Sequence, residues 1–233
     1  IVFGDWSSDV CSSDLLKAKE MALRTQAPIL GINLGYLGFL SESTVTEIRS
    51  SIQDLISGKY RVLKRMLISC HVKRKGKVVS KTEALNDAVL YKGANPGLIR
   101  VKIFAGARYV FDTRCDGVIT STPTGSTAYS LASGGPILAP QMKGMVLCPL
   151  NPHLLTIRPM VFPAEEKLCL RVHGLSREAW LQIDGTNVLA LEEGDEVHIT
   201  ASAHFVNFIK LSKRTFYRSE ERRVGKECRS RWS

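Results

Sequence analysis

The sequence predicts an α+β protein in which a partial α/β domain is followed by an all-β, sandwich-like domain. Up to residue 58 the apolar residues recur at the spacing of helices and of a buried strand, whereas from Tyr60 they alternate with polar residues. Turn residues then recur roughly every ten positions, as in antiparallel sheets. We expect an α/β domain at residues 1–58, a β-rich domain at 59–205, and at 206–217 the start of a segment that returns to the first domain.

Three stretches of the first domain predict its elements. The run "LKAKEMALRTQ" lacks helix breakers and predicts a helix, and the apolar run "APILGIN" predicts a buried parallel strand. In "STVTEIRSSIQDLISG", Thr44 and Glu47 have the spacing of a capping box, and Gly58 follows the end of a second helix. The apolar positions expected to face its core are Val45, Ile48, Ile52, Leu55 and Ile56.

The second domain shows the two-residue period of strands. In "RMLISCHV" the apolar side chains fall on one face, "RKGK" predicts a turn, and "IRVKIFAGARYVFD" predicts two strands joined at Gly106. Further strands are predicted at "GMVLCPL", "EKLCLRVHG", "AWLQIDG" and "DEVHITA". Short strands at this spacing favour a β-sandwich.

Two segments, residues 5–15 and 218–233, share no pattern with their neighbours and resemble translated sequencing-library adapters. Codons can be chosen so that "CSSDL" in the first and "RSEER" in the second are reverse complements. We therefore expect both segments to be foreign to the natural protein and exclude them from the prediction of the fold. Two natural polar tails are the alternative.

The composition argues against two classes of partner. The chain of 233 residues has a net charge of +10, but its lysines and arginines are scattered, without the interleaved aromatic residues on which bases stack. We therefore expect no nucleic-acid partner. No apolar run is long enough for a transmembrane helix, so we expect no membrane partner either.

The cysteines indicate a reducing compartment. Outside the two terminal segments they stand at Cys70, Cys115, Cys148 and Cys169, and no two have the spacing of a zinc or dithiol motif. We expect small buried thiols, no dedicated metal site and a cytoplasmic location.

The stretch "CDGVITSTPTGSTAYSLASGGPIL", residues 115–138, follows a short apolar run with small hydroxyl residues and glycines. Such residues bring backbone amides and hydroxyl donors close to a ligand without steric hindrance. A helix beginning near Ser126 would add an anion site at its N-terminus. The composition suits phosphate and ribose, with a plain turn as the alternative, and the stretch lacks the P-loop pattern.

Two neighbouring stretches carry further polar candidates. In "LNDAVL", Asn86 and Asp87 stand in a strand pattern, where a ligand or a satisfied turn would supply their partners. The proline-rich "PLNPHLLTIRPMVFP" predicts a rigid loop in which His153 and Arg158 are either structural or part of the wall of a site.

Taken in order, "PILGINLGYLGFLSE", "LNDAVL", the hydroxyl-rich stretch, "NPHLLTIRPMVFP" and "LQIDGT" resemble the successive motifs of bacterial NAD kinases. The resemblance implies transfer of the γ-phosphoryl of ATP, with Mg²⁺ as divalent cation, or of polyphosphate, to the 2′-hydroxyl of the adenosine ribose of NAD. It also implies a Rossmann-like first domain with a G-G-D-G loop whose Asp is the base, a second domain that binds NAD, and a homo-oligomer, either dimer or tetramer.

The resemblance assigns NAD-binding roles by position. Asn86 and Asp87 match the pair that holds adenosine and ribose, and Asp116 matches the acid of the D-G step. Thr186 takes the place of an amide in a D-G-Q-like turn that begins at Asp184. The other implied NAD-binding residues are Arg114, Thr124, Thr127, Ala128, Tyr129, Ser130, Leu131 and Ala132.

The catalytic loop departs most from the family. "VFGD" is followed by Trp6 where a glycine is expected, so Asp5 is either the catalytic base or part of the foreign segment. Because a bulky side chain stands where phosphate must approach the backbone, we expect the chain to be impaired as a kinase. The alternatives are a lipid or sphingoid kinase relative and a non-catalytic nucleotide-binding module.

Overall fold

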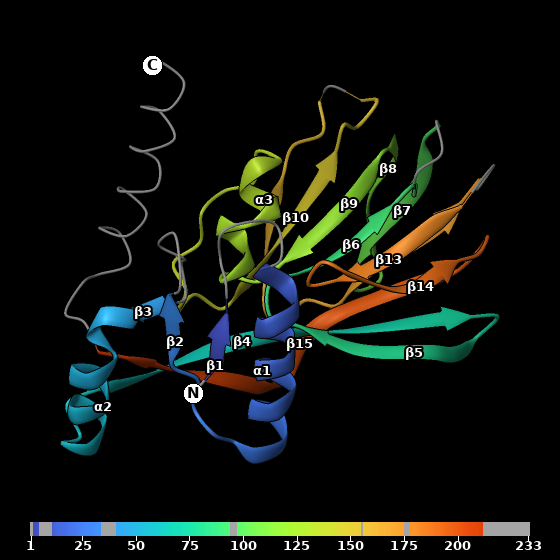
Figure 1. The fold of residues 1–233 in the computed structure, drawn as a ribbon. Helices are drawn as coiled ribbons and strands as arrows, with labels where there is room; N and C mark the ends of the chain where they lie inside the picture. The colour runs from blue at the N-terminus through green and yellow to red at the C-terminus, as the bar shows by residue number, and fades with distance from the viewer. Residues whose placement is uncertain are drawn as a thin grey trace. The chain divides into compact units, whose positions relative to one another are not determined.

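A computed structural model describes residues 2–4, 11–33, 41–93, 97–154, 156–174 and 178–211 (Figure 1). The chain forms two compact units, one of Ile1–Lys64 with Val206–Ser233 and one of Arg65–Phe205. Strands dominate and helices are few, which confirms the mostly β part of the predicted fold class. None of the helices in the described ranges is long and apolar enough to cross a membrane.

The first unit contains a small parallel sheet of order β1-β2-β3, with strands Val2–Gly4, Gly31–Asn33 and Ser41–Thr44. The helix α1 (Cys11–Thr25) lies beside β1 and confirms the first predicted helix (Figure 1). The strand predicted at "APILGIN" is shorter than expected, because only its last three residues pair in the sheet. Just before it, Ile29 forms a parallel bridge with Phe208.

The second predicted helix consists of a 3-10 turn, η1 (Val45–Glu47), followed by α2 (Ile48–Ile56). The amide of Thr44 donates to the Glu47 carboxylate at 3.1 Å, as a capping box requires. The predicted core face is only partly correct. Ile48 and Leu55 pack on the small core of the first unit, whereas the apolar side chains at Val45, Ile52 and Ile56 are exposed. A cluster of three buried side chains is too small to cover every apolar position of the helix.

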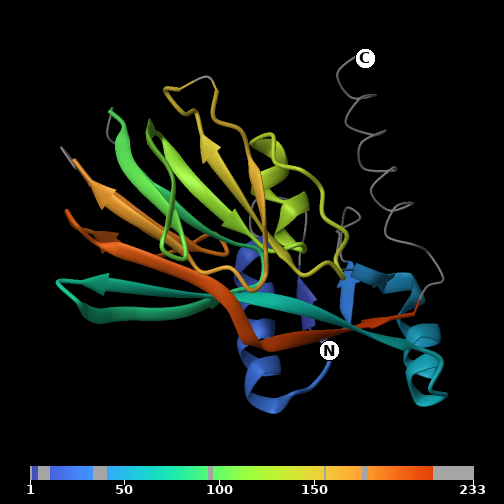
Figure 2. The same cartoon turned by 180° about the vertical axis from the view of Figure 1, so that it is seen from behind.

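The second unit consists of two six-stranded sheets, which Figure 2 shows from behind. The first sheet is antiparallel throughout, and its strands in spatial order are β11 (Met160–Pro163), β10 (Gly144–Leu150), β9 (Gly117–Ser121), β6 (Asp87–Tyr91), β13 (Ala179–Ile183) and β14 (Thr186–Leu191). The second sheet has the order β5 (Lys77–Ala84), β4 (Arg61–Arg74), β15 (Glu196–Lys210), β12 (Leu168–His173), β7 (Ile99–Ala105) and β8 (Arg108–Cys115).

Side chains from both sheets form one apolar core in the second unit. The alternation predicted for "RMLISCHV" is confirmed from Ile68 to Val72, because Ile68, Cys70 and Val72 are fully buried. It fails at the start of the run, where Met66 is only partly buried and Leu67 is fully buried. Leu90 of β6 and Val118 of β9 meet this core from the other sheet. The core therefore holds rigid the strands whose ends carry the polar candidates.

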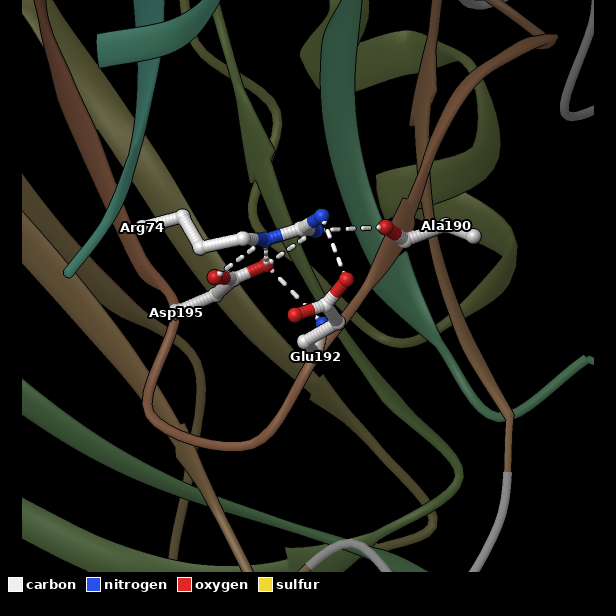
Figure 3. A network of polar contacts seen from close by, with 4 residues as sticks. All are labelled: Arg74, Ala190, Glu192 and Asp195. Atoms are coloured by element: carbon white, nitrogen blue, oxygen red, sulfur yellow. Dashed lines mark hydrogen bonds and ion pairs between the residues drawn. The ribbon is translucent and has the colours of Figure 1, made fainter. Parts of the chain in front are cut away.

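A partly buried ion pair fixes one end of β4 (Figure 3). Arg74 contacts Asp195 at 2.8 Å and Glu192 at 2.7 Å, and it also donates to the carbonyl of Ala190 at 2.9 Å. The Asp195 side chain is fully buried and also accepts the amide of Glu192 at 2.9 Å. The hydrogen bond from Glu192 fixes the Asp195 carboxylate within the turn of residues 192–195, and Arg74 neutralises its charge.

Candidate nucleotide site

The candidate site is built where β6 begins and β9 ends. Asp87 is paired with Ser121, so the step Asn86–Asp87 and the hydroxyl-rich loop leave the same edge of the sheet. On its other side β6 pairs with β13, and the turn at Asp184 follows that strand. Three segments that are far apart in the sequence therefore meet where these three inner strands of the sheet begin or end, which we call the sheet edge.

Asp184 fastens the start of β6. Its carboxylate accepts the backbone amides of Leu85, Asn86 and Asp87 at 2.9, 2.7 and 3.2 Å, and its own amide donates to the Asp87 carbonyl at 2.9 Å. Asp184 is buried and has a left-handed backbone, with φ of 47°. The sequence predicts that Asp184 lies in the D-G turn, but it does not show that its side chain holds the start of β6 in place.

The hydroxyl-rich loop fastens the same step from the other side. Thr122 donates its hydroxyl to the Leu85 carbonyl at 2.5 Å and its amide to the Asn86 carbonyl at 2.8 Å. The Thr122 hydroxyl also accepts the amide of Gly125 at 3.0 Å. A Cβ on Gly125 would lie 2.0 Å from the Asn86 carbonyl oxygen, so only glycine fits against this backbone.

The helix expected to begin near Ser126 forms only in part. A 3-10 turn, η2 (Gly125–Thr127), is followed by α3 (Tyr129–Ala132), a helix of only four residues. Ala128 interrupts them with a non-helical backbone, φ −100° and ψ −129°. The Ser126 hydroxyl donates to the Pro123 carbonyl at 2.7 Å and accepts the Leu138 amide at 3.0 Å, which stabilises the loop instead. The predicted helix therefore begins later than expected, at Tyr129, and is short. Anion binding at this stretch stays a prediction.

Three buried hydroxyls around this loop have no hydrogen-bond partner among the described residues. The side-chain oxygens of Ser121, Thr124 and Ser130 have no hydrogen bond within the part of the chain that the structure describes. Buried polar atoms normally find a partner, so unpaired ones require a reason. A polar ligand at this edge of the sheet would supply hydrogen-bonding groups of the kind they lack.

The Asp87 carboxyl is the buried acid of the site. Its exposed fraction is 5%, and burial together with the charge of Asp184 raises its pKa to about 7. Among the described residues, no side chain donates a hydrogen bond to it. A hydroxyl donor from a ligand would favour its charged form.

Asp116 stands at the opposite end of β9, about 17 Å from Asp87 along the strand direction. Lys92 pairs with it at 2.8 Å and Asn151 donates to it at 2.8 Å, and both hold its pKa below the usual range. The charges of both carboxylates raise the pKa of the Tyr129 phenol, after the larger effect of burial. The Tyr129 phenol is therefore close enough to feel the charge of Asp116 at one end of β9 and that of Asp87 at the other.

The structure brings only some of the predicted residues together. Asn86, Asp87 and Thr124 lie at one edge, where Thr186 follows the Asp184 turn as an exposed residue. Arg114 is exposed on β8 of the other sheet, and its carbonyl accepts the His153 amide at 2.8 Å. Of the remaining loop residues, Thr127 and Ser130 are buried, Ala128 and Leu131 are half-buried, and Tyr129 and Ala132 are exposed. Asp5 lies outside the described residues.

Among the residues that the structure describes, the site has no group of three carboxylates that could hold Mg²⁺. Within the described ranges, the group of three possible metal ligands is Cys169, Glu196 and His198, on the other sheet. A thiol and an imidazole suit zinc rather than magnesium.

Comparison with known proteins identifies the family. A family model described as the ATP-NAD kinase C-terminal domain matches residues 85–211. The NAD kinase of Moorella thermoacetica is 41% identical over 203 residues, which are 87% of this chain and 65% of that protein. The NAD kinase of Desulforamulus reducens is 38% identical over 212 residues, 91% of this chain and 73% of that protein. The chain belongs to the NAD kinase family.

Solved NAD kinase structures agree with this assignment. The yeast NADH kinase complexed with NADH has a TM-score of 0.81 and 30% identity, over 92% of this chain and 61% of that one. An NAD kinase from Archaeoglobus fulgidus in complex with ATP has a TM-score of 0.67 at 24% identity, over 82% of this chain and 71% of that one, which shows the shared fold. The chain thus spans about two thirds of the length of its NAD kinase relatives.

Proposed function

We propose that the chain acts as an NAD kinase and transfers the γ-phosphoryl of ATP, or of polyphosphate, to the 2′-hydroxyl of the adenosine ribose of NAD, which yields NADP. The observation that carries the proposal is the sheet edge where Asp184 and Thr122 hold Asn86 and Asp87 in place. Membership of the NAD kinase family supports it, as does the NADH bound by the yeast relative.

In this proposal Asn86 and Asp87 hold the adenosine and its ribose. A ribose hydroxyl donates to the Asp87 carboxylate, which favours its ionised form and offsets the effect of burial on its pKa. Thr124 and the loop residues 127–132 line the site, and the unpaired hydroxyls find their partners on the dinucleotide. Arg114, Asp116 and Thr186 contact more distant parts of the ligand.

The reaction then follows from positioning. The ribose 2′-oxygen attacks the γ-phosphorus, the bond from that phosphorus to its bridging oxygen breaks, and ADP leaves with the electron pair. The hydroxyl proton passes to a base, for which we propose Asp5. Mg²⁺ enters with ATP as part of the substrate. The residues of the second unit contribute by holding the ribose rigidly, because phosphoryl transfer depends mainly on alignment.

Several further proposals accompany this function. The parallel sheet β1-β2-β3 with α1 is proposed to belong to a Rossmann-like domain, and Arg65–Phe205 to a sandwich that binds NAD. Residues 5–15 and 218–233 are still proposed to be foreign sequence. We also propose a homo-oligomer in the cytoplasm. The described cysteines are free thiols, which is compatible with a reducing compartment.

The test is ATP-dependent NADP formation by two chains. One is the present sequence, and the other carries Gly-Asp-Gly-Thr-Leu in place of residues 5–15. We expect turnover in the second to exceed that of the first by at least about a hundredfold, since lost phosphate-binding amides cost on the order of 3 kcal/mol each. Calorimetric titration with NAD is run on both chains, and the two affinities should agree within about threefold.

Each contrary outcome has its own meaning. Equal turnover would contradict the foreign status of residues 5–15. NAD binding without any turnover in either chain would favour a non-catalytic nucleotide-binding module. Phosphorylation of a sphingoid base without NADP formation would favour the lipid kinase alternative, which the polar lining of Thr122, Thr124 and Asp87 opposes.

A further inference from the structure

A second group of reactive side chains lies on the sheet that does not carry the nucleotide site. Cys169 of β12 is directly paired with His198 of β15, and Glu196 stands two residues before His198 on the same strand. Their ligand atoms lie within 4.8 Å of one another. Because side chains alternate along a strand, all three point to the same face.

This face is the outer one. The neighbours Leu170 and Val197 are fully buried in the core, whereas Cys169, Glu196 and His198 are partly exposed. The three groups are therefore reachable from solvent, yet they are held on paired strands. Sites on rigid elements keep their geometry better than sites on loops.

The donor set and spacing suit one kind of ion. Zinc takes thiolate, imidazole and carboxylate ligands at about 2.0 to 2.3 Å, so neighbouring ligand atoms in a tetrahedron lie about 3.5 Å apart. His198 Nε2 and Glu196 Oε2 are 3.1 Å apart, close to that spacing. The Cys169 sulfur lies within 4.8 Å of both atoms, so it must move only slightly toward them for the three ligands to occupy three corners of a tetrahedron.

We propose that Cys169, Glu196 and His198 bind a zinc ion on the outer face of this sheet, with water in the fourth position. The ion crosslinks β12 to β15. The thiolate and imidazole favour zinc over magnesium and calcium, which prefer oxygen ligands alone.

Arg171 competes for one of the ligands. Its guanidinium forms a short ion pair with Glu196 and also lies 5.7 Å from the centre of the Phe104 ring. When Glu196 turns to the metal, Arg171 keeps this cation–π contact. The Arg171 guanidinium therefore still has the Phe104 ring as a partner when Glu196 binds the metal. Because Arg171 competes with the metal for Glu196, removal of Arg171 should strengthen metal binding.

Zinc binding has a proton signature. Zinc binds the thiolate form of cysteine, so the Cys169 thiol gives up its proton when the ion binds. On binding, the S–H bond breaks, the sulfur–zinc bond forms, and the proton passes to solvent.

The experiment titrates the full chain, without nucleotide, with zinc against a chelating dye and with cobalt, whose charge-transfer absorption reports a thiolate ligand. We expect one ion per chain, proton release in calorimetry, and a melting temperature that rises with zinc. Cys169→Ser should abolish the cobalt band, and His198→Ala and Glu196→Gln should each weaken zinc binding at least tenfold. Arg171→Gln should tighten it about threefold.

Matched controls separate the site from other groups. His173 lies 3.2 Å from Asp112 on the same sheet but has no thiol in that pair, so His173→Ala should change zinc affinity less than twofold. Cys148→Ser should keep the cobalt band. A band that survives Cys169→Ser, or zinc affinity unchanged in His198→Ala, would overturn the proposal, whatever the kinase activity.

Discussion

The carboxylate of Asp184 accepts the backbone amide of Asn86 at 2.7 Å, across a separation of 98 residues in the sequence. Together with the amides of Leu85 and Asp87, this contact ties the turn after β13 to the start of β6. Hydrogen bonds to an ionised acceptor are among the stronger ones in proteins. The conformation of the Asn86–Asp87 step thus depends on this buried side chain, together with the contacts from Thr122 on the other side.

Replacing Asp184 by Ala should destabilise the chain and weaken NAD binding. Three amides, two of them buried, would lose their acceptor, so we expect a loss of about 3 kcal/mol in the free energy of unfolding. Urea denaturation and calorimetric titration with NAD measure the two effects.

Asp184→Asn is the matched control. Asparagine tolerates the left-handed backbone at this position and keeps one acceptor oxygen, so it should cost about half as much. Equal losses in the two variants would mean that the charge, rather than the number of hydrogen bonds, holds the step.

The strands were predictable because their signal is local. The alternation around Cys70 and the turn at Gly106 follow from the two-residue period and from one positive φ, 59° at Gly106. The hydroxyl-rich loop and the Asn86–Asp87 step were also recognisable as polar interruptions of apolar strands. Whether these residues bind NAD stays a prediction.

The pairing of distant segments was not predictable. No local pattern shows that β6 lies between β9 and β13, or that Asp184 reaches Asn86. The stretch near Ser126 forms a 3-10 turn and a four-residue α-helix instead of one longer helix. The Ser126 hydroxyl accepts the amide of Leu138, a contact from outside the stretch that no local pattern shows.

The stability of the chain should fall between about pH 4 and pH 7 through Asp87. Its pKa rises on folding from 3.8 to about 7, so the folded state holds the proton more tightly. The resulting stability is fully present below the unfolded pKa and is lost as pH rises through the folded pKa, at up to about 1.4 kcal/mol per pH unit. Urea denaturation from pH 4 to pH 8 measures the slope.

The variant Asp87→Asn isolates this group, since its amide does not titrate. The difference in stability, variant minus wild type, should grow with pH up to about pH 7 and then level off. Asp184→Asn should reduce the slope, because the charge of Asp184 contributes to the raised pKa. Parallel pH curves for wild type and Asp87→Asn would show that Asp87 has an ordinary pKa.

Gly125→Ala should disrupt the nucleotide site. The new methyl group would lie 2.0 Å from the Asn86 carbonyl oxygen, and backbone on both sides must move to relieve the clash. We expect a loss of about 3 kcal/mol in stability and at least tenfold weaker NAD binding. Gly134→Asn, at φ 83° with open space around it, should cost less than about 1 kcal/mol and leave the affinity unchanged. Similar effects of the two variants would contradict the close approach at Gly125.

Arg74→Ala should destabilise the chain without affecting NAD binding. Removing Arg74 leaves the Asp195 carboxylate buried without its cation (Figure 3), which costs about 3 kcal/mol or more. The control is Arg108→Ala, whose exposed ion pair with Glu166 at 2.6 Å should contribute less than about 1 kcal/mol. If urea denaturation shows the same loss in the free energy of unfolding for both variants, the burial of Asp195 does not make its ion pair with Arg74 more important than an exposed pair.

Thr124→Val should weaken NAD binding without destabilising the fold. The Thr124 side chain is buried, its hydroxyl oxygen has no partner within the described residues, and valine has nearly the same shape. Removing an unpaired buried hydroxyl should leave the free energy of unfolding unchanged or raise it by about 1 kcal/mol. If that hydroxyl serves the dinucleotide, NAD affinity falls by about 1 to 2 kcal/mol, which is roughly five- to thirtyfold.

Thr120→Val is the matched control for this prediction. Thr120 also has a buried hydroxyl with no hydrogen-bond partner in the described part of the chain, but it lies within β9, where its backbone lies opposite Leu147 and Ala88. For Thr120→Val we expect the free energy of unfolding to stay the same or to rise slightly, as for Thr124→Val, and the NAD affinity to stay unchanged. Urea denaturation and calorimetry on both variants give four values. Because a purely structural hydroxyl would lower stability when removed, a destabilised Thr124→Val with unchanged affinity would assign Thr124 to the fold and not to the ligand.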